Sequence, residues 1–473
     1  MTGYLSRRQF LAGAAVAAGG AVAATVAAEH PWTHTAATSA RRSPTTPAKG
    51  TLVLVTLYGG NDGLNTVIPY ADPHYAAARP TLGYPPEQVL PLADGLGLHP
   101  NLKGLKGLWD ARHLAVVLGV GYPNPVLSHF RSMDIWQTAS PTTSVSVGWL
   151  GRWLDSTGTD PMRALSIGPT LPTVLVGTDQ TGTAISTGGM RIAGGAKVAS
   201  SLSALWAPGT DRQGLSARVA GSGADLLSVQ HTLADLLAVS PSAAQGSVTT
   251  APPAGPTSTP SGAGSPTSAG SAGSGSATAG GSPSVPGGAA ARGGTPTATT
   301  APGSTAAGAT AAPTAGALAD GLQLVARLIK AGAPTHVYQV SLGGFDNHAT
   351  EKATHARLMT ELDDAVTGFF ASLDGDPHGD AVTLLTYSEF GRRVSENGSE
   401  GTDHGTAAPL FVAGPSVKGG RFYGAPPSLT NLDDGNLRFT TDFRSVYASV
   451  LGPVLAVEPK LALGSDFANL GFL

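Results

Sequence analysis

The chain has 473 residues, no cysteine and a formal net charge of −3. The lack of thiols excludes disulfide bonds and thiolate chemistry, and the nearly balanced charge argues against nucleic-acid binding, which needs a concentrated positive surface. Length alone would allow two to three domains, but segments that do not fold must first be removed from that count.

The N-terminus has the pattern of a twin-arginine signal peptide. Arg7-Arg8 precedes an apolar run from Leu11 to Ala28 that is rich in Ala, Gly and Val. A membrane span needs about 20 strongly apolar residues, so residues 1–28 are predicted to be a signal peptide, with an uncleaved anchor as the alternative. We expect the twin-arginine translocase to export the protein to the cell envelope or beyond, with residues 29–49 as a flexible leader and no stable membrane span.

Residues 241–316 have a composition that does not support a core. They consist almost entirely of Ala, Gly, Ser, Thr and Pro, with one charged residue, Arg292, and no aromatic residue. Such a segment cannot bury enough apolar surface to offset its chain entropy, so a disordered coil is predicted. It is either a linker between domains or a long insertion in one domain, which a fold tolerates because the cost of loop closure grows slowly with length.

Short apolar runs alternate with helical patterns on both sides of this segment. The apolar runs lie at residues 51–57, 114–120, 336–342, 381–387 and 409–413. The helical patterns lie at residues 131–138, 215–237, 318–329 and 352–373. Runs that are apolar on both faces indicate buried parallel strands, and their alternation with helices predicts an α/β fold with a doubly wound, mostly parallel sheet flanked by helices. We therefore interpret residues 50–240 plus 317–473 as a single α/β domain, with 241–316 as a disordered insertion.

Acidic residues and histidines occur just beyond the ends of these predicted strands. In open α/β sheets, ligands bind past the carboxyl ends of the strands. The candidates are Asp62, Asp346, His348, Glu389, Asp403 and His404. Carboxylates gathered at one edge would repel each other unless a cation held them, and oxygen and nitrogen ligands suit Zn²⁺, Mn²⁺, Mg²⁺ or Ca²⁺. The pattern predicts one divalent metal site or two neighbouring ones, although each motif alone is a weak signal.

Ser128 stands where a helix is expected to begin after the second predicted strand. Serine is a favoured helix N-cap, so capping is one interpretation. The other is catalytic, because a hydroxyl beside a metal can attack a phosphoryl or sulfuryl centre. Asn61, His129 and Arg392 are candidate substrate-binding residues, with simple packing for His129 and a solvated position for Arg392 as the alternatives.

Several motifs, in order along the chain, resemble the exported bacterial family called domain of unknown function 1501. They are LVTLYGGNDGLNTVIPY, LHPNL, GVGYP followed by SHFRSMDIWQTA, GGFDNHA, YSEFGRR and GTDHGTAAP. That family resembles a branch of the alkaline phosphatase and sulfatase superfamily. The resemblance implies an alkaline-phosphatase-like fold with a metal-dependent ester hydrolase site.

The superfamily pattern also implies roles for single residues. Asp62 corresponds to the first-strand metal ligand and Ser128 to the nucleophile, while the later ligands correspond to Asp346, His348, Asp403 and His404, with Glu389 as an additional candidate. The spacing Asp346-x-His348 is tighter than in the phosphatases, and no cysteine is present to become formylglycine, which argues against ordinary sulfatase chemistry.

Two functions follow as expectations. The first is an exported metal-dependent hydrolase that acts on phosphate or sulfate esters of small molecules or polymers. The alternative is a non-catalytic metal- or ligand-binding protein of the cell envelope on the same scaffold. His99 in the motif Leu98-His99-Pro100 is expected to pack a turn rather than to bind a metal.

Overall fold

The computed structural model describes residues 48–188, 195–207, 213–238 and 316–473. The predicted signal peptide (1–28) and almost all of the predicted leader (29–49) and insertion (241–316) lie outside these ranges. These three segments, and the division into domains, therefore stay predictions.

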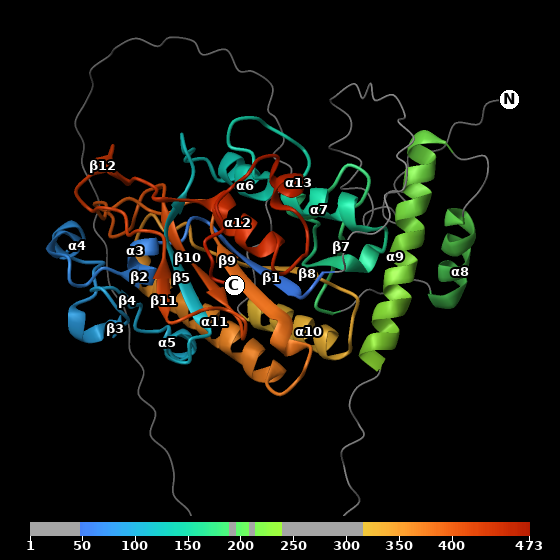
Figure 1. The fold of residues 1–473 in the computed structure, drawn as a ribbon, viewed down its shortest axis with the longest axis horizontal. Coiled ribbons are helices and arrows are strands. Elements are labelled where there is room, and N and C mark those ends of the chain that lie inside the picture. The colour runs from blue at the N-terminus through green and yellow to red at the C-terminus, as the bar shows by residue number, and fades with distance from the viewer. Residues whose placement is uncertain (1–47, 189–194, 208–212, 239–315) are drawn as a thin grey trace, which may run out of the picture. The chain divides into compact units, whose positions relative to one another are not determined.

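A central sheet of nine strands organises the described residues (Figure 1). The strand order is β11-β5-β10-β9-β1-β8-β6-β7, and the short β14 pairs with β5. The strands are β1 Thr51–Tyr58, β5 Leu114–Gly121, β6 Ala164–Ile167, β7 Thr183–Ile185, β8 Val337–Gly343, β9 Val382–Tyr387, β10 Ala408–Ala413, β11 Arg421–Tyr423 and β14 Thr441–Asp442. Every pairing in this sheet is parallel except those made by β10. The α/β class and the mostly parallel sheet are confirmed.

Strand β10 corrects one detail of the prediction. The run 409–413 was expected to be a further parallel strand, but β10 is antiparallel to both β5 and β9. An apolar run shows that a strand is buried but not which way it points. The link from β9 to β10 contains no helix, whereas parallel neighbours need a crossover that is usually helical. Because β10 is reversed, the residues just before it reach the same edge as the carboxyl ends of β5 and β9.

Helices cover both faces of the sheet. They are α5 Lys103–Asp110, α6 His129–Thr138, α7 Trp149–Thr157, α8 Gly195–Trp206, α9 Gly214–Ala238, α10 Ala317–Lys330, α11 Glu351–Leu373, α12 Phe443–Leu451 and α13 Pro459–Leu463. Alternate side chains of β1 point to opposite faces, as the pleat of a strand requires. Val53 and Val55 join a core with α5, α10 and α11, and Leu52 and Leu54 join a second core with α6, α7, α12 and α13. The four helices predicted at 131–138, 215–237, 318–329 and 352–373 correspond to α6, α9, α10 and α11.

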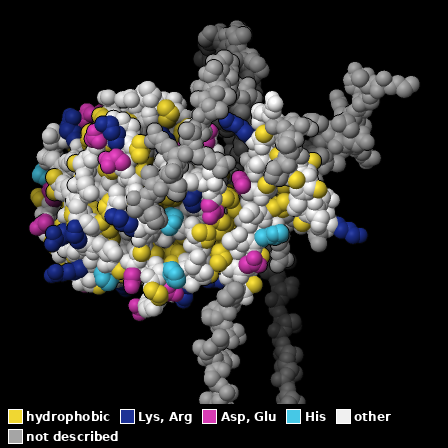
Figure 2. Space-filling view, turned by 45° about the vertical axis from the view of Figure 1, so that its right-hand side comes forward, with side chains coloured by type: hydrophobic (Ala, Val, Ile, Leu, Met, Phe, Trp, Pro, Cys, Tyr) yellow, Lys and Arg dark blue, Asp and Glu magenta, His cyan; other side chains and the backbone are white. Residues whose placement is uncertain are grey.

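Smaller elements lie beside the main sheet. They are α3 Gly63–Thr66, α4 Pro73–Ala78, the sheet of β2 Val67–Ile68, β3 Leu90–Pro91 and β4 Gly97–Leu98, and the pair β12 Leu432–Asp433 with β13 Asn436–Leu437. On the face shown in Figure 2, basic and acidic side chains are interspersed. None of the helices within the described ranges has the length and apolar character needed to cross a membrane.

Candidate functional site

Three histidines and one aspartate meet at the carboxyl edge of the sheet. His129 begins α6 after β5, Asp346 and His348 follow β8, and His404 precedes the reversed strand β10. We call these four residues the His3Asp cluster. From the sequence, Asp346, His348 and His404 were predicted to be metal ligands. The fourth residue, His129, was predicted to bind substrate.

The four side chains approach within hydrogen-bonding distance of each other. Asp346 Oδ1 lies 2.9 Å from His348 Nε2 and 3.2 Å from His404 Nε2. The two Nε2 atoms are 3.0 Å apart, and His129 Nε2 lies 3.3 Å from Asp346 Oδ2. His129 Nε2 is buried and has no hydrogen-bond partner. The Nε2 atoms of all three rings therefore converge on one carboxylate.

The other nitrogen of each ring is hydrogen-bonded away from the centre. His129 Nδ1 donates to Glu389 Oε1 at 2.9 Å, His404 Nδ1 to the carbonyl of Leu127 at 2.8 Å, and His348 Nδ1 to Asp403 Oδ1 at 3.2 Å. Carboxylate and carbonyl oxygens only accept in such bonds, so each Nδ1 carries the proton. When such a ring is neutral, its Nε2 lone pair faces the cluster. The hydrogen bond from Nδ1 fixes the orientation of the ring, as hydrogen bonds to outer-shell residues do in metal sites.

The spacing of the donor atoms of His129, Asp346 and His404 is compatible with one small cation. Zinc binds imidazole nitrogen and carboxylate oxygen at about 2.0–2.2 Å, so neighbouring ligand atoms in a tetrahedron lie about 3.3 Å apart. The four distances above run from 2.9 to 3.3 Å. Within the described residues, His129, Asp346 and His404 form the group of three acidic or imidazole side chains whose donor atoms all lie within 4.8 Å of one another, and His348 is not in that group.

Local charges keep the cluster's carboxylate ionised. Burial favours the protonated form of Asp346, but the hydrogen bond and charge of Arg392, helped by His129 and His404, lower its pKa to about 2. The hydrogen bond to Glu389 raises the pKa of His129 although burial opposes this. Asn397 and His348 lower the pKa of Asp403 by hydrogen bonding. Without a cation, His129 therefore holds a proton more firmly than an ordinary histidine.

Glu389 and Asp403 lie in an outer layer of the site. Each accepts the Nδ1 proton of one cluster histidine. Glu389 is buried and also accepts from the backbone N–H of Gly59 at 2.8 Å. In this geometry the two residues orient His129 and His348, whereas the sequence had proposed both as direct ligands.

Arg392 connects the loops that carry the cluster. Its side chain has an exposed fraction of 0 % and donates to the carboxylate of Asp346 at 2.8 Å. Its other N–H groups donate to the carbonyl oxygens of Gly59, Gly60, Phe345 and Thr402. A guanidinium with this many internal partners positions Asp346, and the enclosed side chain presents no surface to a substrate anion.

Gly59 allows these loops to pack together. Its φ is +115°, and a Cβ atom there would lie 2.5 Å from the backbone nitrogen of Asp346. No side chain fits so close to another backbone, and the φ value is one that glycine adopts at little cost. The motif after β1 is therefore needed to bring the loop after β8 into place.

Asp62 and Asn61 belong to a buried network that the cluster does not include. The carboxylate of Asp62, 1 % exposed, pairs with the buried side chain of Arg79. Burial favours the neutral acid, but the charge and hydrogen bond of Arg79 lower the pKa of Asp62. Asn61 Nδ2 donates to Thr66 Oγ1 at 2.9 Å, and its Oδ1 lies 3.1 Å from His355 Nε2. Both predicted site residues point into the interior.

Ser128 takes the N-cap position of α6, directly before His129. Its hydroxyl makes no capping hydrogen bond, and the residue is exposed. The position predicted for a helix cap is thus correct, while the capping contact is missing. The hydroxyl is free to act in another role.

Sequence reasoning missed several polar residues beside the site. Arg79, Glu351 and His355 are buried, and none of them follows a predicted strand. The signal that could have found His355 is its place on the apolar face of α11, where a polar side chain needs a partner. His99 was expected to pack a turn, and its Nδ1 accepts from the N–H of Asn101.

We expect acid to destabilise the fold through His99 and His355. Burial lowers the pKa of His99 to about 3 and that of His355 to about 4, so both rings are neutral in the folded protein. In the unfolded chain they titrate near 6.5, so below that pH the unfolded state binds more protons and stability falls. Lowering the pH from about 7 to about 5 should therefore reduce the free energy of unfolding by about 2 kcal/mol for each ring.

Urea unfolding of wild type and His99→Gln at both pH values measures this effect. Burial and Asp62 raise the pKa of Glu351 to about 8, which acts in the opposite sense, but this contribution cancels between the two proteins. The variant should lose about 2 kcal/mol less than wild type on acidification. Equal losses would contradict the prediction.

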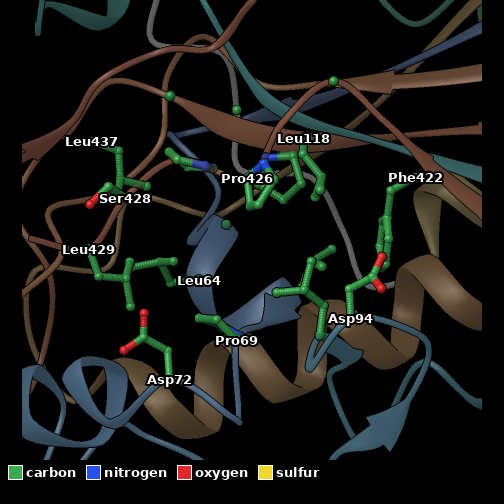
Figure 3. A pocket seen from close by; sticks show the side chains of 18 of the residues that line it. Leu64, Pro69, Asp72, Asp94, Leu118, Phe422, Pro426, Ser428, Leu429 and Leu437 are labelled. Atoms are coloured by element: carbon green, nitrogen blue, oxygen red, sulfur yellow. The ribbon is translucent and has the colours of Figure 1, made fainter. Parts of the chain in front are cut away.

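The protein also contains a cavity of about 620 Å³, whose lining is shown in Figure 3. Its lining is largely apolar and includes Leu64, Leu118, Phe422 and Leu429, and its charged members are Asp72 and Asp94. No residue of the His3Asp cluster lines it. The chemistry-bearing side chains therefore lie outside this cavity.

Comparisons with known proteins support the family prediction. Residues 279–446 match the model of the family described as "Protein of unknown function (DUF1501)". No curated protein matches the chain. The solved structures "Crystal structure of Ps i-CgsB in complex with k-i-k-neocarrahexaose" and "Crystal structure of Ps i-CgsB" share 15% and 16% identity, with TM-scores of 0.23 and 0.21. Each match covers 32% of this chain and 36% of that chain, and such a likeness says nothing about activity.

Proposed function

Taking the DUF1501 match as a premise, we propose that the chain is an exported, metal-dependent hydrolase of phosphate or sulfate esters, with one divalent cation held by the His3Asp cluster. The observation that carries this proposal is the arrangement of three imidazoles, each donating outward from Nδ1 and directing Nε2 to the carboxylate of Asp346. Lone pairs that converge in this way suit a cation, although Arg392 Nη1 also lies 3.5 Å from His348 Nε2. The proposal includes an alkaline-phosphatase-like fold and export by the twin-arginine route, which rest on the sequence motifs.

The donor set narrows the choice of metal. Mg²⁺ and Ca²⁺ bind mainly oxygen, whereas imidazole suits Zn²⁺ and other transition metals. Three imidazoles and one carboxylate therefore favour Zn²⁺ or Mn²⁺ among the four ions considered from the sequence. Such an ion would polarise the ester oxygen and lower the pKa of a coordinated hydroxyl group or water.

The chain supplies a candidate nucleophile directly before a cluster residue. Ser128 is exposed, its hydroxyl is not used as a cap, and it precedes the cluster residue His129. In the proposed reaction, Ser128 Oγ attacks phosphorus or sulfur, the ester bond breaks and the leaving oxygen takes a proton. Water then cleaves the new seryl ester, giving its hydroxyl to phosphorus or sulfur and returning a proton to Ser128.

One observation favours the non-catalytic alternative. With His348 added to the three residues whose donor atoms lie within 4.8 Å of one another, four protein ligands would fill a tetrahedral shell, as in structural zinc sites, whereas catalytic zinc usually keeps one position for water. The exposed fraction of Asp346, which is 47 %, favours catalysis instead, because substrate could reach the ion from that side. The two functions differ in turnover and not in cation binding.

Cation binding and turnover are tested together on the purified protein. After chelation, Zn²⁺ or Mn²⁺ should raise the stability by about 2.7 kcal/mol at 100 times Kd. His404→Ala should remove most of this shift, whereas His378→Ala, which changes an exposed histidine paired with Asp376, should keep it. Calorimetric titration and melting curves measure both effects, and an unmoved melting curve with all four ions would refute the metal site.

Ser128→Ala separates the hydrolase from the binding protein. With p-nitrophenyl esters as substrates, the loss of a nucleophile should lower turnover by several orders of magnitude while cation affinity stays the same. Normal turnover in this variant would remove Ser128 from the reaction. Absence of turnover by the metal-loaded wild type would favour the non-catalytic function.

A further inference from the structure

The charges around the His3Asp cluster limit which ester the proposed site can hold. Three carboxylates contact it or belong to it, namely Asp346, Glu389 and Asp403. One guanidinium, that of Arg392, opposes them. The three rings are neutral when they act as ligands. The protein part of the site therefore has a net charge of −2, which one divalent cation neutralises.

In the part of the chain that the structure describes, no accessible cationic side chain is ion-paired with the three carboxylates of this balance. Among the described residues, Arg392 is the only Lys or Arg side chain that is hydrogen-bonded or ion-paired with the cluster, and it is enclosed by backbone carbonyls. Arg393 is half-exposed and pairs with Asp434 at 3.3 Å, and its charge also helps to lower the pKa of Asp403, which is chiefly lowered by the hydrogen bonds from Asn397 and His348. A phosphate monoester, which carries a charge of nearly −2 near neutral pH, would meet no second positive group to balance it.

An exposed aromatic residue follows one of the cluster residues in the chain. Phe130 follows His129 on the first turn of α6, and its exposed fraction is 86 %. Phe390, by contrast, is buried and lies with its ring centre 4.9 Å from that of His129 and 4.8 Å from that of His404. An exposed aromatic ring one residue after His129 offers contact area to an apolar arm of a substrate.

We infer that the site takes a singly charged ester with an apolar arm, and not a doubly charged phosphate monoester. This inference rests on the proposed function. Phosphodiesters and sulfate monoesters share this chemistry, since both carry one negative charge. In either case the cation takes the anionic oxygen and Phe130 contacts the apolar arm.

Two unreactive anions of nearly equal shape but different charge test whether the site prefers a singly charged ligand. Phenylphosphonate is a dianion at about pH 8, and methyl phenylphosphonate is a monoanion. Calorimetric titration of the Zn²⁺-loaded full chain should show that the monoanion binds at least as tightly as the dianion. Tighter binding of the dianion, or no binding of either anion to metal-loaded protein, would overturn the inference.

A single charge change sharpens this test. Asp403→Asn removes one negative charge, and the amide oxygen can still accept from His348 Nδ1. The ratio of monoanion to dianion affinity should fall on the order of tenfold, since one charge at this range acts through a moderate dielectric. Asp110→Asn is the matched control, because Asp110 ends α5 just before the opposite end of β5 and should leave the ratio unchanged. An unchanged ratio in Asp403→Asn would contradict the charge argument.

Phe130→Ala tests the apolar arm. This substitution should weaken the binding of methyl phenylphosphonate several-fold, whereas Phe130→Tyr should keep most of the affinity. Leu461→Ala, which changes another exposed apolar residue, should not alter the affinity. With the metal-loaded enzyme, bis(p-nitrophenyl) phosphate, p-nitrophenyl sulfate and p-nitrophenyl phosphate then separate diester from sulfate ester. Preference for p-nitrophenyl phosphate would overturn the inference and leave the hydrolase intact, whereas failure to bind any cation would refute the proposed function itself.

Discussion

Arg392→Ala is expected to lower the free energy of unfolding by about 3–5 kcal/mol and to abolish cation binding by the His3Asp cluster. The side chain is fully buried, and its removal leaves the carboxylate of Asp346 without its strongest partner. It also leaves the carbonyl oxygens of Gly59, Gly60, Phe345 and Thr402 without that donor. Unpaired buried polar groups carry their full desolvation cost, so the loops that hold the cluster should separate.

Urea unfolding and zinc titration measure these two effects. Arg393→Ala is a control at the next position, where the side chain is half-exposed and pairs with Asp434 on the surface. Its loss should cost less than about 1 kcal/mol and leave cation affinity unchanged. Arg392→Lys should recover only part of the stability, because an ammonium lacks the planar fork that serves several oxygens. A stable Arg392→Ala variant with normal zinc affinity would contradict the positioning role.

Asp62→Ala is expected to destabilise the protein by about 3–5 kcal/mol and to leave cation affinity almost unchanged. The substitution leaves Arg79 buried without its counter-charge. The sequence-based hypothesis, which makes Asp62 a metal ligand, expects the opposite pattern, with cation binding lost. Measuring unfolding and zinc affinity on the same variant therefore discriminates between the two assignments.

A double variant tests the cause of the expected instability. Asp62→Leu combined with Arg79→Met replaces the buried ion pair with apolar groups, which is often neutral or stabilising. The double variant should recover most of the stability that Asp62→Ala loses. If it stays unfolded, or if the folded single variant no longer binds zinc, the purely structural role of Asp62 is wrong.

The sequence predicted the fold class because burial has a clear signature. The runs at 51–57 and 114–120 are apolar on both faces, and they became β1 and β5 with almost the same bounds. Short strands such as β6 and β7 were missed because three or four residues do not establish a pattern. The direction of β10 was missed because pairing direction is set by tertiary contacts and not by composition.

The site was predicted in part for a similar reason. The position of a residue after a strand correctly indicated the sheet edge for Asp346 and His348, and the reversal of β10 brought His404 there as well. The same rule could not tell which way a side chain turns. Asp62 follows β1 as expected, yet it turns inward to Arg79, a residue in the loop after α4 that no motif marked. Ligand and outer-layer roles depend on such local rotations.

The cluster takes its members from distant parts of the chain, and this has a consequence for synthesis. His129 leaves the ribosome more than 200 residues before Asp346 and His348, and His404 comes later still. His404 Nδ1 donates a hydrogen bond to the carbonyl of Leu127. The segment around Leu127 and His129 therefore lacks this contact until His404 has been synthesised. A nascent chain has no complete cluster until the last of its four members has emerged. Any product that terminates before residue 404 therefore lacks a complete cluster.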